Sequence, residues 1–232
     1  MLPLIYRTRK PQTTGKPQKA EGSPPILLML HGVGSHEEDL LELASYLDPR
    51  FYVVSLRAPR PYQAGGFSWF DLTWTETGVT GDPQQALESL ELLRQFVDGI
   101  RQSDPQLALS PLSVMGFSQG AMMSLLLTLR FPHSVQGAVI MSGRWPTGLE
   151  VDLCAELEGL PLLVVHGTQD QVLSIAEGRE ICRQLQQLPV DLSYSEYEMG
   201  HEVSSDSLLR IRDWLTQQLD PISPASRINQ IQ

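Results

Sequence analysis

The sequence has few cysteines and no long hydrophobic segment. Its 232 residues include two cysteines, Cys154 and Cys182, which lie far apart and form no Cys-x-x-Cys pair. A disulfide scaffold and a zinc site are therefore not expected, and sparse cysteines fit a reducing compartment. No apolar run approaches the ~20 residues that span a bilayer, and no signal-peptide pattern is expected at the N-terminus. These absences predict a cytoplasmic protein without a transmembrane segment.

Positive charge is also scarce. The chain holds 17 lysines and arginines against 27 aspartates and glutamates, which gives a formal net charge of −10. Nucleic acid is not expected as a main partner, because binding a phosphate backbone needs clustered cations. The basic residues that do cluster, between residues 7 and 19, lie in a stretch rich in proline, glycine and threonine. That composition favours a solvated loop over a binding patch.

Short apolar runs alternate with helical patterns along the chain. Runs that are apolar almost throughout are typical of strands buried on both faces of a parallel sheet. The alternation predicts an α/β fold, with a mostly parallel sheet covered by helices on both faces. The predicted strands are 4–9, 25–30, 51–56, 112–115, 135–141, 160–166 and 190–197. The predicted helices begin at Glu37 and cover 83–102, 119–131, 174–188 and 202–219.

The length suits one large domain, which we place at residues 1–219. Within it, residues 10–25 are predicted to form a mobile loop, and the polar residues 220–232 a flexible tail. The segment 67–71, Phe-Ser-Trp-Phe-Asp, concentrates aromatic side chains in an irregular stretch. It is predicted to be either a plug in the core or the wall of a pocket.

Residues 116–120 fit the pattern Gly-x-Ser-x-Gly, between a predicted strand and a predicted helix. In that context the pattern indicates a nucleophile elbow, a strained turn that exposes a serine hydroxyl. The two glycines allow backbone and helix to approach closely. A loop serine of no special role would fit the five residues alone, so the remaining candidates decide the interpretation.

A serine nucleophile needs a general base and an acid that orients the base. His201 lies in a loop after the last predicted strand, and the other histidines have structural alternatives at strand or helix ends. Asp170 follows a buried strand, whereas Asp71 and Asp152 follow none closely. The carboxyl ends of parallel strands meet at one edge, where ligands bind. The order Ser118, Asp170, His201 is that of the elbow type of hydrolase.

The oxyanion of a tetrahedral intermediate needs two preorganised N–H donors. The amide of Gln119 is one candidate, because it begins the helix that follows the serine. The other is the amide of Val33, which lies between two glycines after the strand 25–30.

These residues resemble the phospholipase/carboxylesterase family of α/β-hydrolases, which includes small bacterial carboxylesterases and acyl-protein thioesterases. The resemblance covers about residues 26–219. It implies an α/β-hydrolase fold without a large lid, ester or thioester hydrolysis through an acyl-enzyme, and neither metal nor organic cofactor. It implies a triad of Ser118, Asp170 and His201, and the oxyanion donors Val33 and Gln119. Trp69, Phe70 and Val172 are then expected in the acyl pocket. The matching segments are Leu-His-Gly-Val-Gly (30–34), Ser-Trp-Phe-Asp (68–71), Gly-Phe-Ser-Gln-Gly (116–120), Gly-Thr-Gln-Asp (167–170) and Gly-His (200–201).

Two positions depart from the family pattern. His36 stands where the family often has asparagine, and Ser174 where it often has proline. We expect a carboxylesterase acting on short- to medium-chain esters, with an acyl-protein thioesterase or lysophospholipase as the alternative. A non-catalytic binding module on the same scaffold is a remote alternative, and a homodimer is possible.

Overall fold

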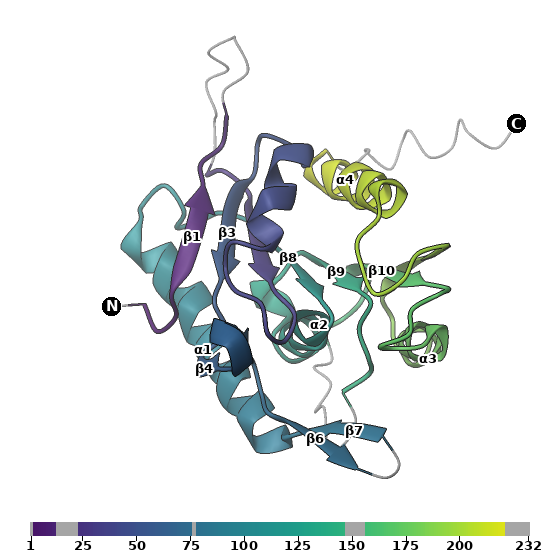
Figure 1. Cartoon of the computed structure of the whole chain (residues 1–232). Helices are drawn as coiled ribbons and strands as arrows, with labels where there is room; N and C mark the ends of the chain where they lie inside the picture. Colours follow the sequence, from purple (N-terminus) through teal and green to yellow (C-terminus); the bar gives the residue numbers. More distant parts are fainter. Residues whose placement is uncertain (1, 13–22, 76–77, 147–155, 221–232) are drawn as a thin grey trace, which may run out of the picture.

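The computed structural model describes residues 2–12, 23–75, 78–146 and 156–220. Within these residues a seven-stranded sheet forms the centre, in the order β1-β3-β2-β8-β9-β10-β11 (Figure 1). Its neighbours pair in parallel, except that β1 is antiparallel to β3. The predicted mostly parallel sheet is confirmed. Its strands are β1 (Tyr6–Arg9), β2 (Ile26–Leu30), β3 (Tyr52–Leu56), β8 (Leu112–Phe117), β9 (Gly137–Met141), β10 (Pro161–Gly167) and β11 (Asp191–Tyr197).

Helices cover both faces of the sheet, as predicted. Successive side chains of a strand point to opposite faces, so each buried strand contributes to two cores. Leu28 and Val114 pack on the side of α1, α2 and α3. Met29 and Met115 pack on the side of η1 and α4. The α-helices are α1 (Pro83–Ser103), α2 (Gln119–Arg130), α3 (Ile175–Leu185) and α4 (Ser205–Leu219), and the 3₁₀ helices are η1 (Leu40–Tyr46), η2 (Gln63–Gly65) and η3 (Pro132–Ser134).

The predicted helix at Glu37 is wrong in its type and start. The chain forms the 3₁₀ helix η1 instead, and it begins at Leu40. Two of the acidic residues before it are bound by arginines, and Asp39 accepts a hydrogen bond from the Ser35 hydroxyl at 2.6 Å. Glu37, only 1% exposed, accepts two hydrogen bonds of 2.6 Å from Arg57. Glu38 accepts one from Arg7 at 3.3 Å.

Other element boundaries also differ from the sequence prediction. β8 continues through Gly116 to Phe117, so the serine follows the strand directly. Ser174 precedes α3 but its side chain makes no capping hydrogen bond, and Glu177 pairs with Arg144 at 2.8 Å. Two small hairpins were not predicted: β4 (Arg60–Pro61) with β5 (Phe67–Ser68), and β6 (Leu72–Thr75) with β7 (Gly78–Gly81).

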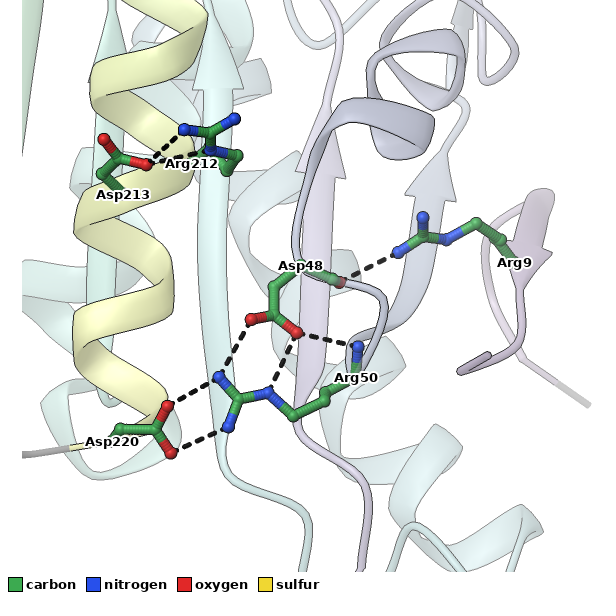
Figure 2. Close-up of polar contacts among 6 residues, drawn as sticks. All are labelled: Arg9, Asp48, Arg50, Arg212, Asp213 and Asp220. Carbon is green, nitrogen blue, oxygen red and sulfur yellow. Dashed lines mark hydrogen bonds and ion pairs between the residues drawn. The ribbon is translucent and has the colours of Figure 1, made fainter. Parts of the chain in front are cut away.

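A cluster of charges ties the end of α4 to the chain before β3 (Figure 2). The Arg50 guanidinium donates to both carboxylate oxygens of Asp48, at 3.0 and 2.9 Å, and to both of Asp220, at 2.8 Å each. Burial raises the pKa of Asp48, but its hydrogen bonds to Arg50 outweigh burial and lower it. The cluster lies at the opposite end of the sheet from Ser118 and links the residue after α4 to the chain before β3.

Two predictions about the chain's irregular parts lie largely outside the described residues. These are the mobile loop at 10–25 and the tail at 220–232. In the part of the chain that the structure describes, no helix is both long and apolar enough to cross a membrane.

The Glu37–Arg57 pair predicts a pH-dependent contribution to stability. The hydrogen bonds from Arg57 lower the pKa of Glu37 below its ordinary value of 4.5, against the opposing effect of burial. The pair's stabilisation is therefore full above that value and is lost as the pH falls through the lowered pKa. Glu37→Gln should reduce the free energy of unfolding by about 1–2 kcal/mol at neutral pH, and by less in acid.

Urea unfolding at several pH values measures this difference. Glu42→Gln is the matched control, because it makes the same change at an exposed position of η1. An equal loss in the two variants, or a loss from Glu37→Gln that grows towards acid pH, would contradict the role given to the pair.

Candidate active site

Ser118 sits at the turn between β8 and α2 in a strained conformation. Its backbone angles are φ 55° and ψ −116°, a combination that residues other than glycine rarely adopt. The flanking glycines permit the turn through close contacts. A Cβ on Gly116 would lie 2.2 Å from the Gly120 carbonyl oxygen, and one on Gly120 would lie 2.0 Å from that of Leu30. The sequence therefore builds the geometry expected of a nucleophile elbow.

Ser118, His201 and Asp170 form a continuous hydrogen-bonded line. The Ser118 Oγ lies 3.0 Å from His201 Nε2, and His201 Nδ1 lies 2.7 Å from Asp170 Oδ2. The ring of Phe117 packs beside the imidazole, with centroids 4.8 Å apart. Ser118 is 8% exposed, whereas the Asp170 side chain is 0% exposed, so the chain of hydrogen bonds runs from near the surface into the interior.

The Asp170 carboxylate is oriented by groups on both of its oxygens. Its Oδ1 accepts hydrogen bonds from the amides of Val172 and Leu173, each at 2.9 Å, and its Oδ2 faces His201. Burial raises the pKa of Asp170, but the hydrogen bonds from His201 and the two amides outweigh it, and the net pKa is lowered. The carboxylate therefore stays ionised and can hold the His201 Nδ1 proton.

Two of the other histidines are buried and two are exposed, and the buried His166 lies 3.5 Å from Asp170 Oδ2 through its Nε2. His31 Nδ1 lies 2.7 Å from the Gly32 carbonyl oxygen, and its Nε2 accepts a hydrogen bond from the Ala58 amide at 3.0 Å. His166 is buried, and its Nε2 lies 2.8 Å from the Leu173 carbonyl. His36 and His133 are exposed.

The two candidate oxyanion donors lie at the start of α2 and in the loop after β2. In the described part of the chain, neither the Val33 nor the Gln119 amide donates to another protein group. Gly32 brings their loops together, because a Cβ there would lie 3.3 Å from the Ser118 Cβ. Within the described residues both amides thus lack a protein acceptor, as an oxyanion donor must, and their role in an oxyanion hole stays a prediction.

The expected pocket residues fall into two groups. Trp69 and Phe70 are 0% and 2% exposed, which leaves them little surface for an acyl chain in this conformation. Val172 is 68% exposed, two residues beyond Asp170. Their place in an acyl pocket stays a prediction.

In the described part of the chain, the rival acids are not placed beside His201. Asp71 is exposed and accepts a hydrogen bond from the Gln85 side chain at 3.1 Å, and Asp152 lies outside the described residues.

Sequence reasoning missed one polar group beside the serine. The Gln119 side chain is buried and binds the backbone of the aromatic segment, with its Oε1 2.7 Å from the Trp69 amide nitrogen. Its Nε2 donates to the Phe70 carbonyl at 2.7 Å. The sequence signals only the backbone of Gln119, through its place at a helix start.

Comparisons with known proteins identify the family of the chain. The sequence model of the family described as Phospholipase/Carboxylesterase matches residues 16–219. The chain belongs to the phospholipase/carboxylesterase family. It is therefore a hydrolytic enzyme of the ester hydrolase class.

The chain is similar in sequence to individual relatives and in fold to a solved structure. It is 27% identical to the "Probable carboxylesterase SOBER1-like" of Arabidopsis thaliana, over 87% of this chain and 81% of that protein. It is 25% identical to the "Acyl-protein thioesterase 1" of Kluyveromyces lactis, over 87% of this chain and 95% of that protein. The crystal structure of the Bacillus cereus carboxylesterase shares the fold, with a TM-score of 0.75 at 22% identity over 93% of this chain and 94% of that one.

The hydrogen bonds of Asp170 predict the effect of replacing it with asparagine. In Asp170→Asn the amides of Val172 and Leu173 hold the side-chain oxygen, so the NH₂ group faces His201 Nδ1. That nitrogen must then accept, which leaves the proton on Nε2 facing Ser118. Turnover should fall by roughly 10³- to 10⁴-fold, as measured by steady-state ester hydrolysis.

Asp71→Asn is the control, because it makes the same change at the rival acid. It should keep turnover within about twofold of wild type, an effect equivalent to ~0.4 kcal/mol. A larger loss in Asp71→Asn than in Asp170→Asn would assign the acid to Asp71.

Proposed function

We propose that this enzyme hydrolyses carboxylic esters through an acyl-enzyme on Ser118. The observation that carries the proposal is the continuous contact from Ser118 Oγ through the His201 ring to the buried Asp170 carboxylate. A free serine hydroxyl is a weak nucleophile, and a histidine oriented by an ionised acid is the arrangement that activates it.

The reaction runs in two halves. His201 Nε2 takes the Ser118 proton as Oγ attacks the ester carbonyl, and the amides of Val33 and Gln119 donate to the resulting oxyanion. The C–O bond to the alcohol then breaks, and His201 gives its proton to the leaving oxygen. Water attacks the acyl-enzyme by the same route, which releases the acid and restores Ser118. Asp170 stays ionised and stabilises the imidazolium.

The proposed substrates are esters of short to medium chain length. The alternative is a thioester or lysophospholipid substrate, and the likeness to a Kluyveromyces lactis acyl-protein thioesterase supports the thioester version. A non-catalytic module is a poorer account, because it gives no reason for a strained serine in contact with a histidine–aspartate pair. We further propose a cytoplasmic location, supported by the sparse cysteines, of which Cys182 is free and buried. The homodimer stays a prediction.

Removing the Ser118 hydroxyl tests the proposal. Ser118→Ala should lower turnover of a short p-nitrophenyl ester by at least ~10³-fold, because the acyl-enzyme cannot form. Ser110→Ala is the matched control, since Ser110 is also buried, precedes β8 at the far end of the sheet, and its Oγ has no partner in the described structure. Turnover near the wild-type level in Ser118→Ala would refute the assignment.

A series of acyl chain lengths tests the substrate class. kcat/KM should be highest for acetyl to octanoyl p-nitrophenyl esters and fall for palmitoyl esters. The matching thioesters should be slower at every length. If palmitoyl thioesters are the best substrates instead, the enzyme is an acyl-protein thioesterase.

A further inference from the structure

Trp69 connects the two segments that carry the proposed oxyanion donors. Its backbone amide donates to the Gln119 side chain, at the start of α2, over 2.7 Å. Its indole Nε1–H donates to the His31 carbonyl, at the end of β2, over 2.9 Å. His31 lies two residues before Val33 in the sequence. One buried residue is thus bonded to both sides of the proposed oxyanion site.

The Gln119 side chain can make these bonds in one orientation only. The Trp69 N–H requires an oxygen, and the Phe70 carbonyl requires an N–H, so Oε1 and Nε2 are both assigned by their partners. The two 2.7 Å hydrogen bonds join the Gln119 side chain to the backbones of Trp69 and Phe70, which are consecutive in the aromatic segment. Buried polar groups held on both sides in this way have little freedom to move.

His31 is fixed in a single tautomer on the other side. The Ala58 amide donates to Nε2, so Nε2 is the acceptor and the ring proton is on Nδ1, 2.7 Å from the Gly32 carbonyl. Burial lowers the pKa of His31 and keeps the ring neutral. The carbonyl to which Trp69 donates therefore belongs to a residue whose ring is itself anchored at two points.

Trp69 has a third anchor on helix α1. The Ser89 hydroxyl donates to the Trp69 carbonyl, and both side chains are fully buried. The amide, the carbonyl and the indole N–H of Trp69 are thus all bonded to different elements. Burial alone requires that these groups have partners, but here the partners come from three different elements, so Trp69 links the start of α2, the residue after β2 and helix α1.

We propose that Trp69 is a positioning residue that sets the spacing of the Val33 and Gln119 amides in the oxyanion hole. The inference rests on the proposed function, because it needs an oxyanion at Ser118. Donors stabilise a transition state most when their positions are fixed before the charge develops, and displacement by about 1 Å can cost ~10²-fold in rate. In this role Trp69 affects the oxyanion through the two amides, and the effect does not depend on contact between its ring and the acyl chain.

Trp69→Phe tests this by removing the indole N–H while keeping an aromatic side chain. With p-nitrophenyl acetate, kcat should fall by roughly tenfold or more, part of the 10²- to 10³-fold loss seen when one oxyanion donor is removed. KM should change little. The affinity for an alkyl trifluoromethyl ketone, whose serine adduct carries an oxyanion, should fall by a similar factor.

Trp214→Phe is the matched control, because Trp214 is buried in the core on the other face of the sheet. It should lower the melting temperature without changing kcat or ketone affinity. If Trp69→Phe does not fold, Gln119→Met supplies the test, since it keeps the backbone amide and removes both side-chain bonds. It should show the same parallel loss of kcat and ketone affinity.

Three results would overturn the proposal. The first is wild-type kcat and ketone affinity in a folded Trp69→Phe. The second is a loss that is absent with acetyl esters and grows with acyl length, which would make Trp69 a pocket wall. The third is an equal catalytic loss in Trp214→Phe. Failure of the proposed function looks different, because the wild-type enzyme itself would then lack Ser118-dependent hydrolysis.

Discussion

The start of α2 lies directly against the backbone at the end of β2, with no side chain between them. A Cβ on Gly120 would lie 2.0 Å from the Leu30 carbonyl oxygen and 2.6 Å from that of His31. This contact brings the turn at Ser118 beside the loop after β2, and it depends on a glycine at that position. The strained serine and the segments that carry both candidate oxyanion amides meet at this approach of helix to strand.

The remaining catalytic groups reach the serine because the sheet is parallel. β8, β10 and β11 end at the same edge, with only β9 between β8 and β10, so Ser118, Asp170 and His201 follow strand ends that lie close together although they are far apart in sequence. In a parallel sheet the loops after the strands all lie at the carboxyl edge, and ligands bind there. Burial of Asp170, offset by two amide hydrogen bonds, keeps an ionised acid at the inner end of the line.

The sequence predicted the sheet well, because strands buried on both faces are apolar throughout and stand out from amphipathic helices. It also placed Ser118, Asp170 and His201 at one edge, where the structure brings them into contact, although their catalytic roles stay a prediction. It failed where long-range partners decide the outcome. Glu37 looks like a residue of a helix's first turn until Arg57, twenty positions away, is placed beside it. The Gln119 side chain is likewise explained only by a segment fifty residues distant.

Covalent labelling of the folded enzyme with a fluorophosphonate, followed by mass mapping of its peptides, tests the central claim most directly. The reagent is attacked by an activated serine and leaves a stable adduct on its oxygen. The account predicts one adduct, on the peptide that contains Ser118, with ester hydrolysis lost in proportion to labelling. An adduct on a different residue, or full hydrolysis after complete labelling of Ser118, would contradict it.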